Sequence, residues 1–311
     1  MKPRFVFLPA SAIGPYVDDL RAIERATDYP IADGADAFTI DHGADYGAFF
    51  TTLGHDARFV LALDAQDGRR VVGGVAGVAR NVRIGRSMVP ALYGADLKLL
   101  PELRGRGFGR DMMSWGFGLF FKHPDLFTWR FAYVAAMRGA RGDVMRAVRG
   151  VHPARLTGKL ARLAVYFAAP ERLAALSLQA APPPPDVDRG VDLSFVPTGD
   201  VGAPGLVSTA GRKDLRLRST GLPWPLVHLP YGPCRWQPTW GHYLKACGQA
   251  LAARAGQPPI ACFAIDERLV SHTAWLSGQG VTRGAACTVY ALDLTLRARR
   301  ASWVHLATSE I

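Results

Sequence analysis

Hydrophobic and polar residues alternate in short segments through the first half of the chain, and this period of two predicts strands. Apolar residues recur at helical spacing in two places, at residues 13–26 and 46–53. A Gln66-Asp67-Gly68 turn signal joins two of the strands into a hairpin. The predicted strands of this half are 4–8, 58–64, 70–82, 93–100, 127–137 and 159–168, with a short helix at 142–148.

Residues 88–121 combine both patterns. The alternating part ends at Pro101, which cannot donate a ladder hydrogen bond. A turn with glycine at every second position, Gly105, Gly107 and Gly109, comes next, and apolar residues then recur at helical spacing. This order predicts a strand, a tight turn and a helix.

Four consecutive prolines, Pro182 to Pro185, continue neither helix nor sheet and favour an extended segment. We therefore predict an α+β protein with a first domain at residues 1–170, a proline-rich linker at 171–186 and a second α+β domain at 187–311. In the second domain a helix is predicted at 240–255, and strands at 191–196, 260–265, 269–276, 287–294 and 303–307.

The glycine-rich turn suits an anion. Because glycine has no side chain, the N–H groups of residues 104–110 can point into one concavity, with a helix N-terminus directly behind them. A P-loop is excluded because no Lys-Ser/Thr follows the last glycine, and the dinucleotide fingerprint fails because the glycines are spaced two and two. A structural turn with its arginines in solvent is the simpler alternative.

The turn matches R-x-x-G-x-G at Arg104, Gly107 and Gly109, and an L-x-P sequence precedes it at 99–101. This arrangement resembles the acyl-CoA-binding motif of the GNAT superfamily of N-acyltransferases, and the predicted order of elements over 1–170 is that of a GNAT domain. The resemblance implies a mixed, mostly antiparallel sheet flanked by helices. Since the motif does not recur after the linker, the second domain is either a degenerate GNAT-like half of a tandem or an unrelated α+β domain.

By the same resemblance, the turn binds the CoA pyrophosphate, and the strand before it pairs with the pantetheine and the thioester carbonyl. The co-substrate is then acetyl-CoA by default, or another acyl-CoA, and the acceptor is an amine that the sequence does not identify. The residues that the resemblance assigns to CoA are Leu97, Leu99, Leu100, Arg104, Gly105, Arg106, Gly107, Phe108, Gly109 and Arg110.

A general base is expected on the same strand. Family members often carry a carboxylate at the position matched by Tyr93, and the only nearby acid is Asp96, which a regular strand turns to the opposite face. A bulge at Gly94 would reset the alternation and bring Asp96 toward the acceptor. An ion pair of Asp96 with Lys98 or Arg80 is the alternative.

The tyrosine that many family members use as general acid has no match in the predicted helix at that place. Tyr133 and Tyr166, on neighbouring predicted strands, are substitutes, although both also suit the core. His152 is a further candidate base. The predicted catalytic residues are thus Asp96, Tyr93 and Tyr133, and the competing hypothesis is a catalytically silent protein that senses acyl-CoA.

The composition and net charge of the chain limit the classes of partner that we expect. The net charge is +11 over 311 residues, but the arginines are scattered, so we expect CoA phosphates rather than nucleic acid as the anionic partner. The apolar run at 5–12 is too short for a signal peptide or a membrane span, so a cytoplasmic protein is expected. The second domain is expected to shape the acceptor site or a homodimer. Cysteine spacing indicates neither a metal site nor a disulfide framework for Cys234, Cys247, Cys262 and Cys287.

An aromatic-rich set lies in and after the helix that follows the turn. These side chains would suit a long acyl chain, and packing in the core is the simpler explanation. The set comprises Trp115, Phe117, Phe120, Phe121 and Phe127.

Overall fold

The computed structural model describes residues 3–31, 34–126, 128–137, 157–195, 205–236, 238–254 and 259–311. The predicted short helix at 142–148, the candidate base His152 and the aromatic residue Phe127 lie outside these ranges. Within them, no helix is both long and apolar enough to cross a membrane.

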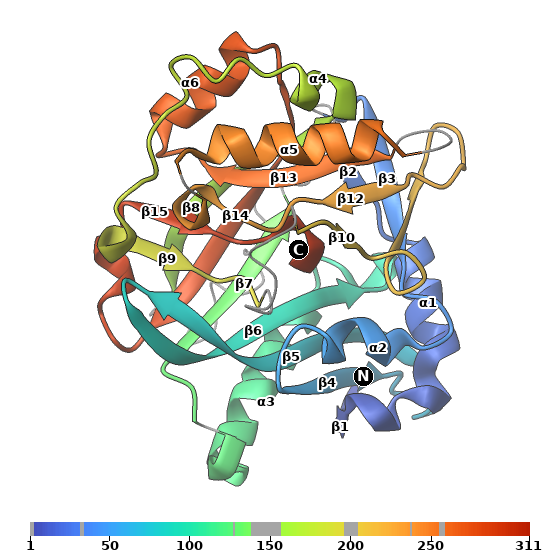
Figure 1. Cartoon of the computed structure of the whole chain (residues 1–311). Helices are drawn as coiled ribbons and strands as arrows, with labels where there is room; N and C mark the ends of the chain where they lie inside the picture. Colours follow the sequence, from blue (N-terminus) through green and yellow to red (C-terminus); the bar gives the residue numbers. More distant parts are fainter. Residues whose placement is uncertain are drawn as a thin grey trace.

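Twelve strands of the described residues form one large sheet through the middle of the molecule (Figure 1). Most neighbouring strands are antiparallel, and β6 with β7, β12 with β13, and β9 with β15 are parallel pairs. β9 (Gly190–Asp192) pairs with β5 and with β15 (Trp303–His305) beside the main path. The main path runs β1 (Arg4–Pro9), β4 (Asp56–Leu63), β5 (Val71–Ile84), β6 (Ser87–Leu99), β7 (Phe131–Met137), β14 (Arg283–Asp293), β8 (Gly158–Ala168), β13 (Ile260–Asp266), β12 (Leu226–His228) and β10 (Val207–Ser208).

Strands from both sides of the prolines share this sheet. β14 lies between β7 and β8 and is antiparallel to both. A second, three-stranded sheet also joins strands from both sides of the prolines. In it, β11 (Asp214–Leu217) pairs with β3 (Asp36–Asp41), which pairs with β2 (Tyr29–Ile31). The large sheet therefore contains strands from both predicted domains. That the two domains, divided at residues 171–186, can fold independently stays a prediction.

Helices flank the sheet, as Figure 1 shows for α5, which lies across β13 and β12, and for α3, which lies near β6 at the opposite end of the molecule. α5 buries residues three and four positions apart against the strands, among them Trp240, Leu244, Cys247 and Leu251. The helices are α1 (Val17–Arg25), α2 (Tyr46–Thr51), α3 (Phe108–Lys122), α4 (Pro170–Ala174), α5 (Trp240–Ala252) and α6 (Val270–Gly278).

The α+β fold class and the mostly antiparallel sheet are confirmed, but one predicted element is wrong. Residues 269–276, predicted as a strand, form α6. Its buried residues are His272, Trp275 and Leu276, three and four positions apart, so the apolar run follows the helical period. A run this short fits both patterns. The short strands β2, β3, β10, β11 and β12 were not predicted.

Candidate functional site

The turn before α3 leaves the start of that helix open. Gly105 and Gly107 have φ values of 77° and 87°, which glycine adopts without strain. Gly107 is the N-cap of this 15-residue helix and has no side chain to cap the first turn. The N–H groups of Phe108, Gly109 and Arg110 therefore have no partner within the helix, and they point where an anion is stabilised by the helix dipole.

The three arginines of the turn divide into two kinds. Arg104 holds the turn in place, because its Nε donates to the Leu99 carbonyl at 2.9 Å and its Nη2 to Thr27 Oγ1 at 2.9 Å. Arg106 and Arg110 are exposed beside the open helix end. The motif arginine is thus a positioning residue, and the other two can face an anion.

β6 and β7 separate close to this turn. They pair only from Ala91–Phe131 to Gly94–Val134. Beyond that point β7 stays paired with β14, and β6 stays paired with β5 as far as Leu99. No other described strand pairs with β6 on that side, so its alternate N–H and C=O groups face the gap. The predicted CoA contacts Leu97 and Leu99 lie on this free edge.

A β-bulge changes the direction of the side chains in the part of β6 that is not paired with β7. Gly74 lies opposite Lys98, and Ala76 lies opposite Ala95, so Asp96 and Leu97 of β6 lie opposite Val75 alone, and β6 has one extra residue at this place. Asp96, one of these two, has a φ of 57°. Gly94, predicted to form the bulge, is regularly paired with Gly77, so the prediction is corrected by two residues. The left-handed conformation is accessible to aspartate as well as to glycine, which is why glycine was a poor marker here.

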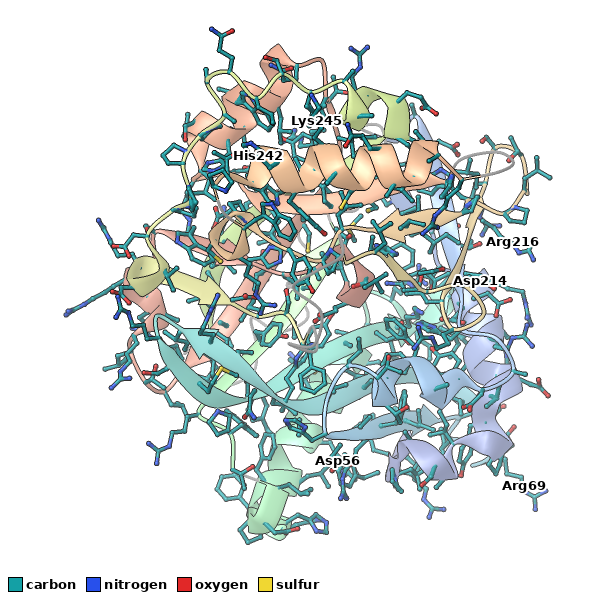
Figure 2. The ribbon with its side chains drawn as sticks, in the orientation of Figure 1. Asp56, Arg69, Asp214, Arg216, His242 and Lys245 are labelled. Carbon is teal, nitrogen blue, oxygen red and sulfur yellow. The ribbon has the colours of Figure 1, made fainter. Side chains whose placement is uncertain are left out.

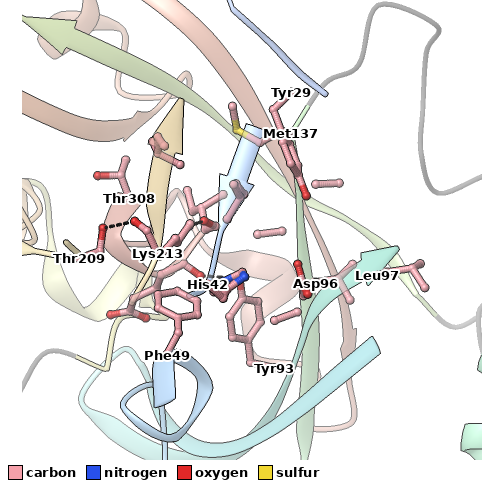
Figure 3. Close-up of a pocket in the computed structure, with 18 of the residues that line it drawn as sticks. Tyr29, His42, Phe49, Tyr93, Asp96, Leu97, Met137, Thr209, Lys213 and Thr308 are labelled. Atoms are coloured by element: carbon pink, nitrogen blue, oxygen red, sulfur yellow. Dashed lines mark hydrogen bonds between the residues drawn. The ribbon is translucent and has the colours of Figure 1, made fainter. Parts of the chain in front are cut away.

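A cavity of about 200 Å³ lies where the two strands separate. Its walls come from both halves of the chain. Figure 3 shows Asp96 and His42 toward one side of it and Thr209, Lys213 and Thr308 toward the other.

Five polar side chains form a buried cluster at this cavity. Asp96 accepts a hydrogen bond from the Tyr46 hydroxyl and pairs with the Lys98 ammonium group. Lys98 Nζ also donates to Glu24 Oε1 at 2.7 Å, and Glu24 contacts His42 Nδ1. Burial opposes charge, but Lys98, His42 and the Tyr46 hydrogen bond together outweigh it and hold the pKa of Asp96 below its ordinary value, while Asp96 raises the pKa of Lys98. The alternative prediction, an ion pair of Asp96 with Lys98, is confirmed, whereas Arg80 pairs with Glu310.

His42 is the member of this cluster with a free ring nitrogen. Its backbone N–H donates to Glu24 Oε2 at 3.1 Å, and its Nδ1 faces Glu24 Oε1. When Nδ1 carries the proton and donates it in a hydrogen bond to the Glu24 carboxylate, the neutral ring has its lone pair on Nε2. Nε2 is buried and has no partner among the described residues. The rings of Tyr46, Phe49 and Phe50, each centred 5.0 Å away, fix the imidazole.

The far wall carries a second pair of titratable groups. Burial, with Lys98 nearby, lowers the pKa of Lys213 to about 8, and its Nζ donates to the main-chain oxygen of Ile311. Burial and the Lys213 charge lower the pKa of His228 to about 3, so this imidazole stays neutral. Its Nδ1 lies 2.9 Å from Thr308 Oγ1.

The predicted tyrosines engage main-chain groups. Tyr93 donates to the Glu310 carbonyl at 2.6 Å and Tyr133 to the Leu193 carbonyl at 3.1 Å, and their rings stack at 4.8 Å. Burial raises the pKa of both hydroxyls. Tyr166 stacks on Phe263 in a different part of the core. These contacts favour a packing role, and a catalytic role for Tyr93 and Tyr133 stays a prediction.

Carboxylate and imidazole atoms of Glu24, His42 and Asp96 lie within 4.8 Å of one another, a spacing that suits a metal ion. The Lys98 ammonium group contacts both carboxylates and fills this position with a positive charge. We therefore assign no metal to the cluster.

Sequence analysis missed Glu24, His42 and Tyr46. Glu24 falls on the buried face of α1 together with Leu20 and Ile23, and a carboxylate on an apolar helix face is a signal that could have been used. His42 follows β3, an unpredicted strand, so nothing in the sequence pointed to it.

Comparison with known proteins follows from this geometry. No protein-family model and no curated protein matches the sequence. A GCN5-related N-acetyltransferase from Anabaena variabilis ATCC 29413 superposes with a TM-score of 0.52 and 12% identity, over 94% of this chain and 74% of that chain. Saccharomyces cerevisiae N-myristoyltransferase with bound myristoyl-CoA superposes with a TM-score of 0.53 and 9% identity, over 94% and 79%. At such identities the similarity is one of fold, and the chain has the fold of the GNAT superfamily of N-acyltransferases.

Proposed function

We propose that this protein transfers an acyl group from an acyl-CoA to an amine. The observation that carries the proposal is the alignment of three features along β6: the open helix end at the turn, the free edge at Leu97 and Leu99, and the cavity where β7 departs. A pyrophosphate on the turn and a pantetheine along the edge would place the thioester at the cavity. Neighbours of the same fold include an N-acetyltransferase and a protein holding myristoyl-CoA, which supports this class of reaction.

The reaction needs a neutral amine and a stabilised thioester. The amine nitrogen attacks the carbonyl carbon, the C–N bond forms, the C–S bond breaks and CoA leaves as the thiol. Main-chain N–H groups on the free edge of β6 can donate to the carbonyl oxygen as charge develops on it. One proton must leave the nitrogen, and one must reach the sulfur.

We assign the base role to His42 rather than to Asp96, the residue expected from the sequence. Asp96 already accepts from Tyr46 and Lys98, and its depressed pKa makes it a weak proton acceptor. His42 lines the same cavity and its Nε2 has no partner among the described residues, and Glu24 would stabilise the imidazolium that forms when Nε2 takes the proton. His42 can then pass this proton to the leaving thiolate. Asp96 holds Lys98 and Tyr46 in place.

The second half of the chain supplies the acceptor's surroundings. Thr209, Lys213 and His228 line the wall opposite Asp96, and all three follow the prolines in sequence. The amine acceptor would enter between this wall and the His42 ring, so residues beyond 187 select it.

A thiol-release assay tests the proposal. The full chain is incubated with acetyl-CoA or decanoyl-CoA and a panel of small amines and peptides, and free CoA and the acylated amine are measured by thiol titration and mass spectrometry. We expect thiol release that requires an amine. Binding of CoA without release for any amine would support the sensor hypothesis instead.

A further inference from the structure

A second, larger cavity lies between α3 and the large sheet. It measures about 360 Å³ and is mainly apolar. Protein interiors are close-packed, so an apolar space of this size is unusual and lies in the range of ligand pockets. Several small residues among its lining leave room for it, namely Gly77, Ala79, Gly94 and Ala132 on the strands and Gly116 on α3.

This α3 cavity adjoins the site of the proposed thioester. Val75, Gly94, Met113 and Val134 line both cavities, so the two lie on either side of the point where β6 and β7 separate. A Cβ atom on Gly94 would come within 2.8 Å of Val134 Cγ1, so glycine is needed for β6 and β7 to approach this closely where the two cavities meet.

The two cavities differ in polarity. His42, Asp96 and Lys213 face the first cavity, where an amine would have to react. In the α3 cavity the charged residues include Asp56 and Arg58, which are partly exposed and pair at 2.7 Å, so they lie at its rim. Asp56, labelled in Figure 2, is at the start of β4, on the side of the molecule where α3 lies. The lining of the α3 cavity is thus mainly apolar.

We propose that the α3 cavity binds the acyl chain of the donor, and that the donor is an acyl-CoA with a chain much longer than acetyl. This inference rests on the proposed function and names its donor class. The aromatic side chains Phe117 and Phe120 of α3 line the chain site and do not merely fill the core. A chain that starts at the thioester beside Gly94 enters the cavity directly, whereas acetyl would leave it empty.

Gly116 offers the variant that closes the cavity. A Cβ atom there would meet only Val60 Cγ2, at 3.9 Å, so Gly116→Leu can be accommodated and would extend into the space. Leucine also favours a helix over glycine. Gly118→Leu is the matched control, because Gly118 lies on the same helix, has nothing within 4 Å of its Cβ position and does not line the cavity.

The test measures the affinities of CoA, acetyl-CoA and decanoyl-CoA for the full chain by calorimetry. Burying a few methylene groups at about 0.8 kcal/mol each should make decanoyl-CoA bind at least tenfold more tightly than acetyl-CoA. Gly116→Leu should remove that difference and leave CoA affinity within twofold, while Gly118→Leu should keep both values.

The outcomes separate this inference from the proposed function. Equal affinities for acetyl-CoA and decanoyl-CoA in the wild type, or a preference that survives Gly116→Leu, would overturn the chain site while CoA binding still supports the function. If no CoA compound binds, the proposed function fails and the chain site with it.

Discussion

Substitution of His42 tests the mechanism most directly. His42→Asn keeps a donor near Glu24, since the Asn amide can replace the Nδ1–H, but it removes Nε2 from the cavity. Glu24 retains Lys98 at 2.7 Å and the residue 42 backbone N–H at 3.1 Å, so its charge stays satisfied. We expect the free energy of unfolding to fall by about 1 to 3 kcal/mol, because Asn fills less of the space between the Tyr46, Phe49 and Phe50 rings. Turnover should fall about a hundredfold to ten-thousandfold, the usual cost of losing a general base.

The assay is amine-dependent thiol release from decanoyl-CoA across a pH range, with CoA affinity and thermal unfolding measured on the same samples. If His42 is the base, kcat falls, the acidic limb of the pH-rate profile disappears, and CoA affinity stays within twofold. His42→Gln places an amide near the position of Nε2 and serves as the control for shape, because it cannot take the proton either. Turnover within threefold of wild type for both variants would refute the assignment.

Three further predictions test the turn, the ion pair and the division of the chain. Gly107→Asp puts a side chain and a negative charge where φ is 87°; we expect CoA to bind at least tenfold more weakly by calorimetry, and unchanged affinity in a folded variant would contradict the anion site. Asp96→Asn should lower the free energy of unfolding by about 3 kcal/mol at neutral pH while kcat falls less than tenfold. Because the pKa of Asp96 in the folded state lies below its ordinary 3.8, ionised Asp96 stabilises the fold above that pH, and this stabilisation is lost as pH falls through the folded pKa. Denaturant titrations should therefore show that the difference in free energy of unfolding between wild type and Asp96→Asn shrinks below about pH 4. A fragment ending at Pro185 lacks β14 between β7 and β8, so we expect it to be insoluble or unable to bind CoA; a soluble fragment that unfolds cooperatively and binds CoA would support independent domains.

Elements with a clear local pattern were predicted correctly, including the short elements β1, α2 and β13. α3, with its glycine turn, and the strands β4, β5 and β8 were found close to their predicted limits, because local conformation follows local chemistry at Gly107 and in long alternating runs. The place of β14 was not predictable in this way. Its pairing with β7 joins residues about a hundred and fifty positions apart, as in Cys287 with Met137, and no local pattern records such a contact.

Only part of the cluster around Asp96 could be predicted from the sequence, because its other members come from elements distant in the chain. Asp96 and Lys98 are neighbours on one strand, so their pairing could be expected from sequence. Glu24 and Tyr46 come from α1 and α2, and His42 comes from the segment between β3 and α2. These side chains meet only because the two helices pack beside β6, so the free Nε2 of His42 is a property of the tertiary fold.

The bulge explains why a strained residue stands at the centre of the site. Leu92 and Gly94 face the α3 cavity, and regular alternation would turn Asp96 and Lys98 the same way. The one extra residue after Ala95 shifts the alternation, so that Asp96 reaches Tyr46 on α2 and Lys98 reaches Glu24 on α1. A left-handed conformation costs a residue other than glycine about 1 to 2 kcal/mol, and the Tyr46 hydrogen bond and the Lys98 ion pair hold the Asp96 side chain in place. The pairing of β6 with β7 ends at Gly94, directly before this bulge, and the gap beyond it is where we propose that the thioester binds. The strain at Asp96 and the opening of the sheet therefore lie at one place in β6, which supports the proposal that Asp96 is a positioning residue.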